Sequence, residues 1–109
     1  MYNKMEIELD REKIEREGYD YGEYVVWLDG LFAEKNLPRD KSALPSLLYG
    51  GKNPGKDWGN VLLMSVILEN TPEFFGNCRK WSWLSEKYGN NYEEDILKHL
   101  NEKHGRIGA

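Results

Sequence analysis

Met5-Glu6-Ile7-Glu8-Leu9-Asp10 alternates apolar and acidic side chains near the start of the chain. A period of two is typical of a β-strand with one buried face. From Asp10 the signals become helical, because Asp10 suits an N-cap and Gly18 suits the position just after a helix. A strand at 5–9 followed by a short helix at 11–17 predicts a fold that mixes both kinds of element.

Two capping boxes predict further helices, since each places a Glu three residues after an Asp or Asn cap. The first, Asp20-Tyr21-Gly22-Glu23, opens a helix that we expect to end near residue 35. Its apolar residues recur at spacings of three and four: Tyr24, Trp27, Leu28, Leu31 and Phe32. The second box, at 91–94, opens a helix that turns Ile96, Leu97 and Leu100 inward.

The sequence does not settle the secondary structure in the middle of the chain. Residues 58–69 are apolar nearly all round, which favours a buried helix and leaves a central strand as the alternative. Residues 47–50 and 79–84 read as further strands. We therefore predict an α+β fold with three main helices packed on a small, mostly antiparallel sheet, in a single compact domain over 1–109.

Composition limits the functional class. The chain has 109 residues, a net charge of −4 and one cysteine, so it cannot form an internal disulfide. Its longest apolar stretch, 61–68 with Ser65 inside it, is far shorter than a membrane span. The first residues lack the layout of a signal peptide. We expect a cytoplasmic protein that has no cofactor and no membrane association.

The acidic charge is concentrated at the front. Residues 1–34 carry ten acidic and four basic side chains and so have a net charge of −6. Such a block disfavours nucleic acid and favours a partner with a basic surface. The residues that we expect to contact such a protein partner are Glu6, Glu8, Glu12, Glu15 and Asp20. The alternative is that these charges are only the solvated sides of helices.

Aromatic residues are the second candidate surface. Fourteen of the residues are aromatic, and the densest run is Phe74 to Leu84. Large rings supply most of the energy of core packing and of protein interfaces. We predict that Phe74, Phe75, Trp81 and Trp83 form an aromatic anchor patch on the partner-binding surface, while core packing explains the same residues. The sequence leaves both possibilities open.

Two alternative functions rest on other motifs. Gly50 to Lys56 follows the first seven positions of a phosphate-binding G-x-x-x-x-G-K loop, with Lys52 and Lys56 as the phosphate ligands. Asp57 replaces the hydroxyl residue, and Pro54 removes one amide donor, so a Gly/Pro connector is the simpler interpretation. The mixture of cations and rings at 79–83 suits stacking of single-stranded nucleic acid on Trp81 and Trp83.

No catalytic constellation emerges, and we predict that the chain is not an enzyme. Asp95, His99 and Glu102 share one helical face at a spacing that suits a metal, but a polar outer face explains them equally well, and we predict no metal. Cys78 has no sequence relation to a histidine that would activate it.

As a whole, the run 10–18, the aromatic helix after it, Asp57-Trp58-Gly59-Asn60-Val61 and the Trp-rich segment after Phe74-Phe75 resemble short uncharacterised proteins carried on bacterial mobile genetic elements. The resemblance implies no catalytic residue. It implies that the chain, like small phage or mobile-element proteins, binds and inhibits a host protein such as a defence enzyme.

Overall fold

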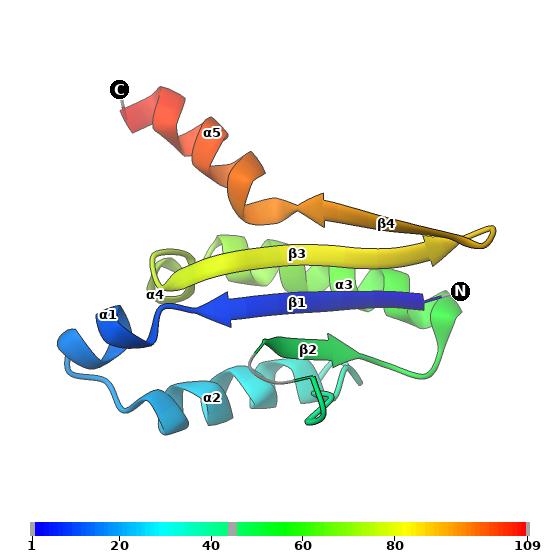
Figure 1. Cartoon of the computed structure of the whole chain (residues 1–109), viewed down its shortest axis with the longest axis horizontal. Coiled ribbons are helices and arrows are strands. Elements are labelled where there is room, and N and C mark those ends of the chain that lie inside the picture. The colour runs from blue at the N-terminus through cyan, green and yellow to red at the C-terminus, as the bar shows by residue number, and fades with distance from the viewer. Residues whose placement is uncertain (1, 44–45, 109) are drawn as a thin grey trace.

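The computed structural model describes residues 2–43 and 46–108, with side chains as far as residue 103. The strands are β1 (Tyr2–Leu9), β2 (Leu47–Gly50), β3 (Cys78–Lys87) and β4 (Asn90–Asp95). The helices are α1 (Arg11–Arg16), α2 (Tyr21–Ala33), α3 (Pro54–Glu69), α4 (Pro72–Phe75) and α5 (Ile96–Gly108). Figure 1 shows their arrangement along the sheet.

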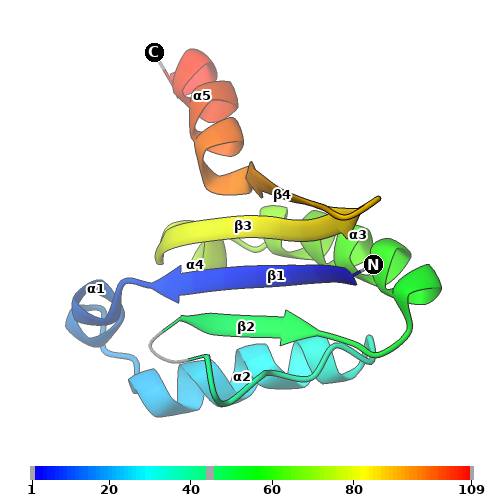
Figure 2. The same cartoon turned by 45° about the vertical axis from the view of Figure 1, so that its right-hand side comes forward.

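The four strands form one antiparallel sheet in the order β2-β1-β3-β4. β1, the strand predicted at 5–9, lies in the interior of the sheet, with Ile7 opposite Leu47 on one side and Trp81 on the other. Figure 2 shows β1 between β2 and β3. The predicted α+β class is confirmed, including the antiparallel sheet and the three main helices, which are α2, α3 and α5.

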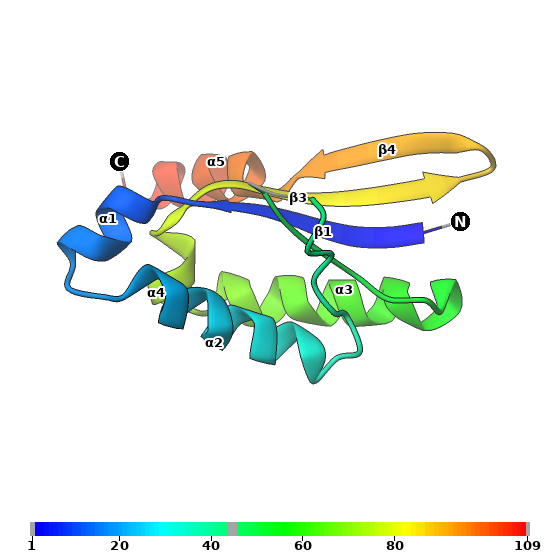
Figure 3. The ribbon, with the colours of Figure 1, turned by 60° about the horizontal axis from the view of Figure 1, so that its bottom comes forward.

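The core lies between this sheet and a layer of helices. Figure 3 shows α2 and α3 side by side on one face of the sheet. The period of two in β1 directs Met5, Ile7 and Leu9 toward these helices, and all three are buried. Tyr49 stacks on Phe32 with ring centroids 3.9 Å apart, and the Phe74 ring lies 5.1 Å from that of Trp81.

Local capping signals were read correctly for the first two helices. The Asp10 carboxylate accepts the backbone N–H of Lys13, and the Asp20 carboxylate accepts that of Glu23. α1 ends at Arg16 with Glu17 as its C-cap, and the next residue, Gly18, has a φ of +91°, the left-handed conformation that glycine adopts readily. The connection from β1 through α1 to α2 is therefore encoded residue by residue.

α3 confirms a helix at 58–69 but corrects two details. It begins earlier, at Pro54, because Asn53 caps it by accepting the N–H of Lys56. It is also not buried all round, since Trp58, Leu62, Leu63 and Val66 are exposed. The sheet covers only one face of the helix, and an apolar composition could not indicate which face that would be.

The helix start predicted from the second capping box, at 91–94, is wrong. Residues 90–95 form strand β4, and the helix that follows begins at Ile96 with the Asp95 carboxylate accepting the N–H of Lys98. The cause is the preceding turn, in which Tyr88 has φ +54° and Gly89 has φ +79°. Two successive positive φ angles are typical of the tight turns that join hairpin strands. The hairpin pairs 90–95 with β3 and overrides the local helix signal.

Within the residues that the structure describes, no helix is long and apolar enough to span a membrane.

Candidate functional site

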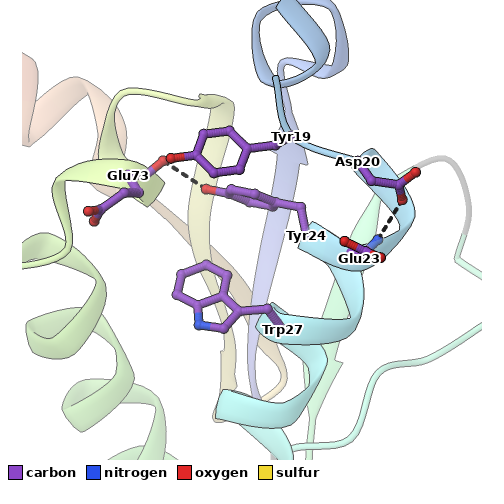
Figure 4. A pocket seen from close by; sticks show the side chains of 6 residues that line it. All are labelled: Tyr19, Asp20, Glu23, Tyr24, Trp27 and Glu73. Carbon is purple, nitrogen blue, oxygen red and sulfur yellow. Dashed lines mark hydrogen bonds between the residues drawn. The ribbon is translucent and has the colours of Figure 1, made fainter. Parts of the chain in front are cut away.

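A pocket of about 340 Å³ opens between α4, the first turns of α2 and the connection that precedes α2. Figure 4 shows the side chains that line it: Tyr19, Asp20, Glu23, Tyr24, Trp27 and Glu73. We call this set the aromatic pocket. Tyr19 follows Gly18, where the chain turns after α1, and Tyr24 and Trp27 lie one after the other along the first turns of α2.

The three rings form a floor and two walls. Tyr24 is only 8% exposed and forms the floor, while Tyr19 is 50% exposed and Trp27 is 40% exposed. The Tyr24 ring meets the Tyr19 ring at 68° and the Trp27 ring at 64°, with centroids 6.5 Å and 5.3 Å apart. Figure 4 shows Tyr24 between Tyr19 and Trp27, so the exposed ring surface of the pocket belongs to Tyr19 and Trp27.

A long-range hydrogen bond holds the floor in place. The Tyr24 hydroxyl donates to the backbone carbonyl of Glu73 over 2.8 Å and so ties α2 to α4. Burial raises the pKa of Tyr24 from its ordinary value of 10.0 to about 12, so the phenol stays neutral and donating well above physiological pH. The floor is therefore a fixed surface that does not titrate near neutrality.

The rim of the aromatic pocket is acidic. Asp20, Glu23 and Glu73 carry its three carboxyl groups, and none of its six lining residues is basic. The Asp20 carboxylate also caps α2, so the helix holds this group in position. Rings with open faces beside carboxylates make a site that attracts a cation and repels an anion.

The five acidic residues predicted to contact a partner lie on different elements of the fold. Glu6 and Glu8 lie on β1, Glu12 and Glu15 on α1, and only Asp20 lines the aromatic pocket. Glu6 forms an ion pair with Lys80, and Glu15 forms one with Arg11. Both carboxylates therefore have a cationic neighbour: Arg11 lies one helical turn before Glu15 in the sequence, whereas strand pairing brings Lys80 to Glu6.

The four residues of the predicted aromatic anchor patch differ in their burial. Phe74 and Trp81 have no exposed surface and pack against each other in the core. A fully buried ring cannot contact a partner or stack on a base, so we withdraw both residues from the predicted surface. Phe75 and Trp83 are partly buried against the core. The Trp83 indole N–H donates to the Asn3 side chain over 3.1 Å.

The phosphate-binding alternative finds a different local structure. Lys52 and Lys56 are exposed, but the loop amides that would bind phosphate are engaged, since the N–H groups of Lys56 and Asp57 donate to Asn53. Asp57 is buried, and its carboxylate lies against Gly51. A carboxylate inside the loop would repel a phosphate.

Metal and thiol chemistry have no arranged site in the part of the chain that is described. No three His, Cys, Asp or Glu side chains there are grouped to hold a metal ion. Asp95 caps α5. Burial raises the pKa of the Cys78 thiol to about 12, which disfavours the nucleophilic thiolate.

Sequence reasoning missed most of the aromatic pocket. Tyr24 and Trp27 looked like part of the apolar stripe of the helix, but the sheet covers only the side of α2 that carries Leu28 and Phe32. A local signal was present in the acidic residues next to the rings at 19–24. Glu73 had no such signal, because only tertiary packing brings α4 to α2.

Comparisons with protein-family models, with curated proteins and with solved structures found no match.

Proposed function

We propose that the chain is a non-enzymatic binding domain whose partner is a protein with a basic surface. The observation that supports this proposal most directly is the aromatic pocket, which three rings line and three acidic residues border. In this interpretation the pocket receives the cationic end of one lysine or arginine side chain of the partner.

The physical basis is the combination of ring faces and negative charge. A cation over an aromatic face gains about 0.5–2 kcal/mol, with the larger values where water is excluded. The rings of Tyr19 and Trp27 provide partly water-excluded faces, and Glu23 and Glu73 add attraction at the rim. Nucleic acid is disfavoured as the partner, because the same carboxylates repel phosphates.

A pair of peptides tests the proposal. The probe is the short peptide Ac-Gly-Ser-Arg-Ser-Gly-NH2, and its control carries citrulline, which keeps the shape of arginine but has no charge. We expect the arginine peptide to shift the NMR signals of Trp27 and Tyr24 and the citrulline peptide to leave them in place. Trp27→Ala should weaken binding at least about tenfold, as loss of an interface anchor does.

Two controls separate this pocket from general acidity. Glu73→Gln should weaken binding, whereas Glu34→Gln changes an exposed carboxylate at the far end of α2, outside the pocket, and should not. Equal shifts with both peptides, or equal losses in Glu73→Gln and Glu34→Gln, would contradict the proposed cation site.

The wider hypothesis is that the chain acts in the cytoplasm as a mobile-element or phage inhibitor that covers a basic groove of a host defence protein. It predicts that charge reversal at Glu8, Glu12 and Asp20 weakens the complex and reduces its salt dependence. Unchanged affinity of this triple variant for the partner would contradict the electrostatic part of the hypothesis.

A further inference from the structure

The outer edge of β4 is the open end of the sheet. In the order β2-β1-β3-β4, β4 pairs with β3 alone among the described strands, and all six of its residues are exposed. The opposite edge is covered, because β2 has only four residues and an isolated bridge joins Arg39 to Tyr49 within it. Figure 1 shows α5 leaving the sheet at the end of β4, so the length of this edge stays uncovered within the described chain.

β4 has few of the features by which proteins protect an open edge. It contains no proline and no lysine, and its pairing with β3 runs from Asp95 to Asn90 without a bulge. Its carboxylates, at 93–95, repel another strand only where a second carboxylate lies opposite. The unpaired backbone N–H and C=O groups of such an edge can be satisfied by a further strand.

The tight turn between β3 and β4 determines which backbone groups face outward. Two residues separate Lys87 from Asn90, and in a hairpin of this kind the residues that flank the turn form a hydrogen-bonded pair. Bonded and non-bonded pairs alternate along antiparallel strands. Asn91 and Glu93 therefore direct their N–H and C=O groups away from β3, toward the open edge.

We propose that the β4 edge pairs with the β4 edge of a second copy of the chain, antiparallel and about a two-fold axis at Tyr92, so that both sheets become one. In this register Asn91 of each copy lies opposite Glu93 of the other, and their outward backbone groups bond to each other. The two Tyr92 residues form the non-bonded pair between them, with Cα atoms about 4.5 Å apart. Tyr92 is 53% exposed in the single chain, and an aromatic pair across strands adds stability.

The side chains of β4 are complementary to themselves in this register. Each Glu93 carboxylate lies opposite an Asn91 amide, and each Glu94 carboxylate lies opposite an Asn90 amide, which can donate to it. Within the chain, Asn91 uses its side-chain oxygen to accept from the Tyr2 hydroxyl, which leaves its amide N–H groups for the second copy.

Other registers of self-pairing are less favourable. Only shifts by two residues keep outward backbone groups opposite each other, because these groups alternate along the strand. A shift in one direction places the two Glu93 carboxylates opposite each other, which like charges disfavour. A shift in the other direction carries the pairing past Asn90 into the turn. The sequence of β4 therefore selects the register centred on Tyr92.

Sedimentation velocity of the full chain at concentrations from micromolar to millimolar tests the proposal. We expect a monomer that converts to a dimer as concentration rises. Asn91→Glu places a carboxylate opposite Glu93 on both sides of the axis and should weaken dimerisation about tenfold. Asn101→Glu is the matched control, since it adds the same charge at an exposed position of α5 and should leave dimerisation unchanged.

Two further variants test the edge and the register separately from charge. The exchange variant Asn91→Glu/Glu93→Asn again places each carboxylate opposite an amide, so it should restore dimerisation. Glu93→Pro removes an N–H that points away from β3. It should therefore preserve the fold, as measured by near-UV circular dichroism, and abolish the dimer.

A chain that stays monomeric at millimolar concentration would overturn the proposal. A dimer that Glu93→Pro leaves intact would also overturn it, because another surface would then hold the two copies. Failure of the exchange variant to dimerise would contradict the register. Trp27→Ala should leave dimerisation unchanged, because the aromatic pocket contains no residue of β4.

Discussion

Replacing Gly51 with alanine should destabilise the fold, although glycine to alanine is often stabilising. A Cβ added at Gly51 would lie 2.7 Å from the backbone carbonyl oxygen of Asn36 and would also meet the Asp57 carboxylate. The carboxylate can rotate away, but the Asn36 carbonyl belongs to the backbone. Forcing an extra carbon into a packed site costs about 1–3 kcal/mol.

The matched control is Gly30→Ala. Gly30 lies within α2, and a Cβ there meets no atom within 4 Å. Alanine is favoured over glycine in a helix interior by about 0.8–1 kcal/mol, so this change should stabilise the protein. The two substitutions are chemically identical and differ only in what surrounds them.

Thermal unfolding followed by circular dichroism measures both effects. For a chain of this length, 1 kcal/mol corresponds to a change in Tm of about 4 °C. We expect Gly51→Ala to lower Tm by roughly 4–12 °C and Gly30→Ala to raise it by about 4 °C. A Gly51→Ala protein as stable as wild type would refute the close approach of Gly51 to Asn36.

Two further predictions concern α5 and the aromatic pocket. Asp95→Ala should lower the free energy of unfolding, measured in urea, by about 1 kcal/mol, because it removes the cap of α5. Asn91→Ala changes the cap that the sequence suggested and should cost less than about half of that. The reverse order would support a helix that begins at the second capping box. The pKa of Tyr24 is raised to about 12 from an ordinary value near 10, so the folded state holds its proton more tightly than the unfolded state. This contribution to stability is complete below pH 10 and is lost as pH rises through 12. Urea midpoints between pH 9 and 12 should fall less steeply for Tyr24→Phe than for wild type, and parallel declines would count against the buried phenol.

Local chemistry explains where prediction succeeded. Asp10 and Asp20 each cap a helix with their own side chain, and the alternation in 5–9 buries one face of β1, so neighbours in sequence were sufficient. It failed at 91–94, where two local signals compete. Asn91 and Glu94 favour a helix start, but the left-handed turn at Tyr88 and Gly89 aligns the segment with β3, and the hydrogen bonds of strand pairing decide the outcome.

The candidate sites depend more on tertiary packing than on local sequence. The sequence by itself determined that the chain has helices, strands and more large rings than local contacts explain. Only the tertiary structure decided that Trp81 is buried while Trp27 and Trp58 reach the surface, and that Glu73 joins Tyr24 across 49 positions of sequence. The physical reason is that burial of a ring depends on which layer covers its side of the element, and distant segments supply that layer.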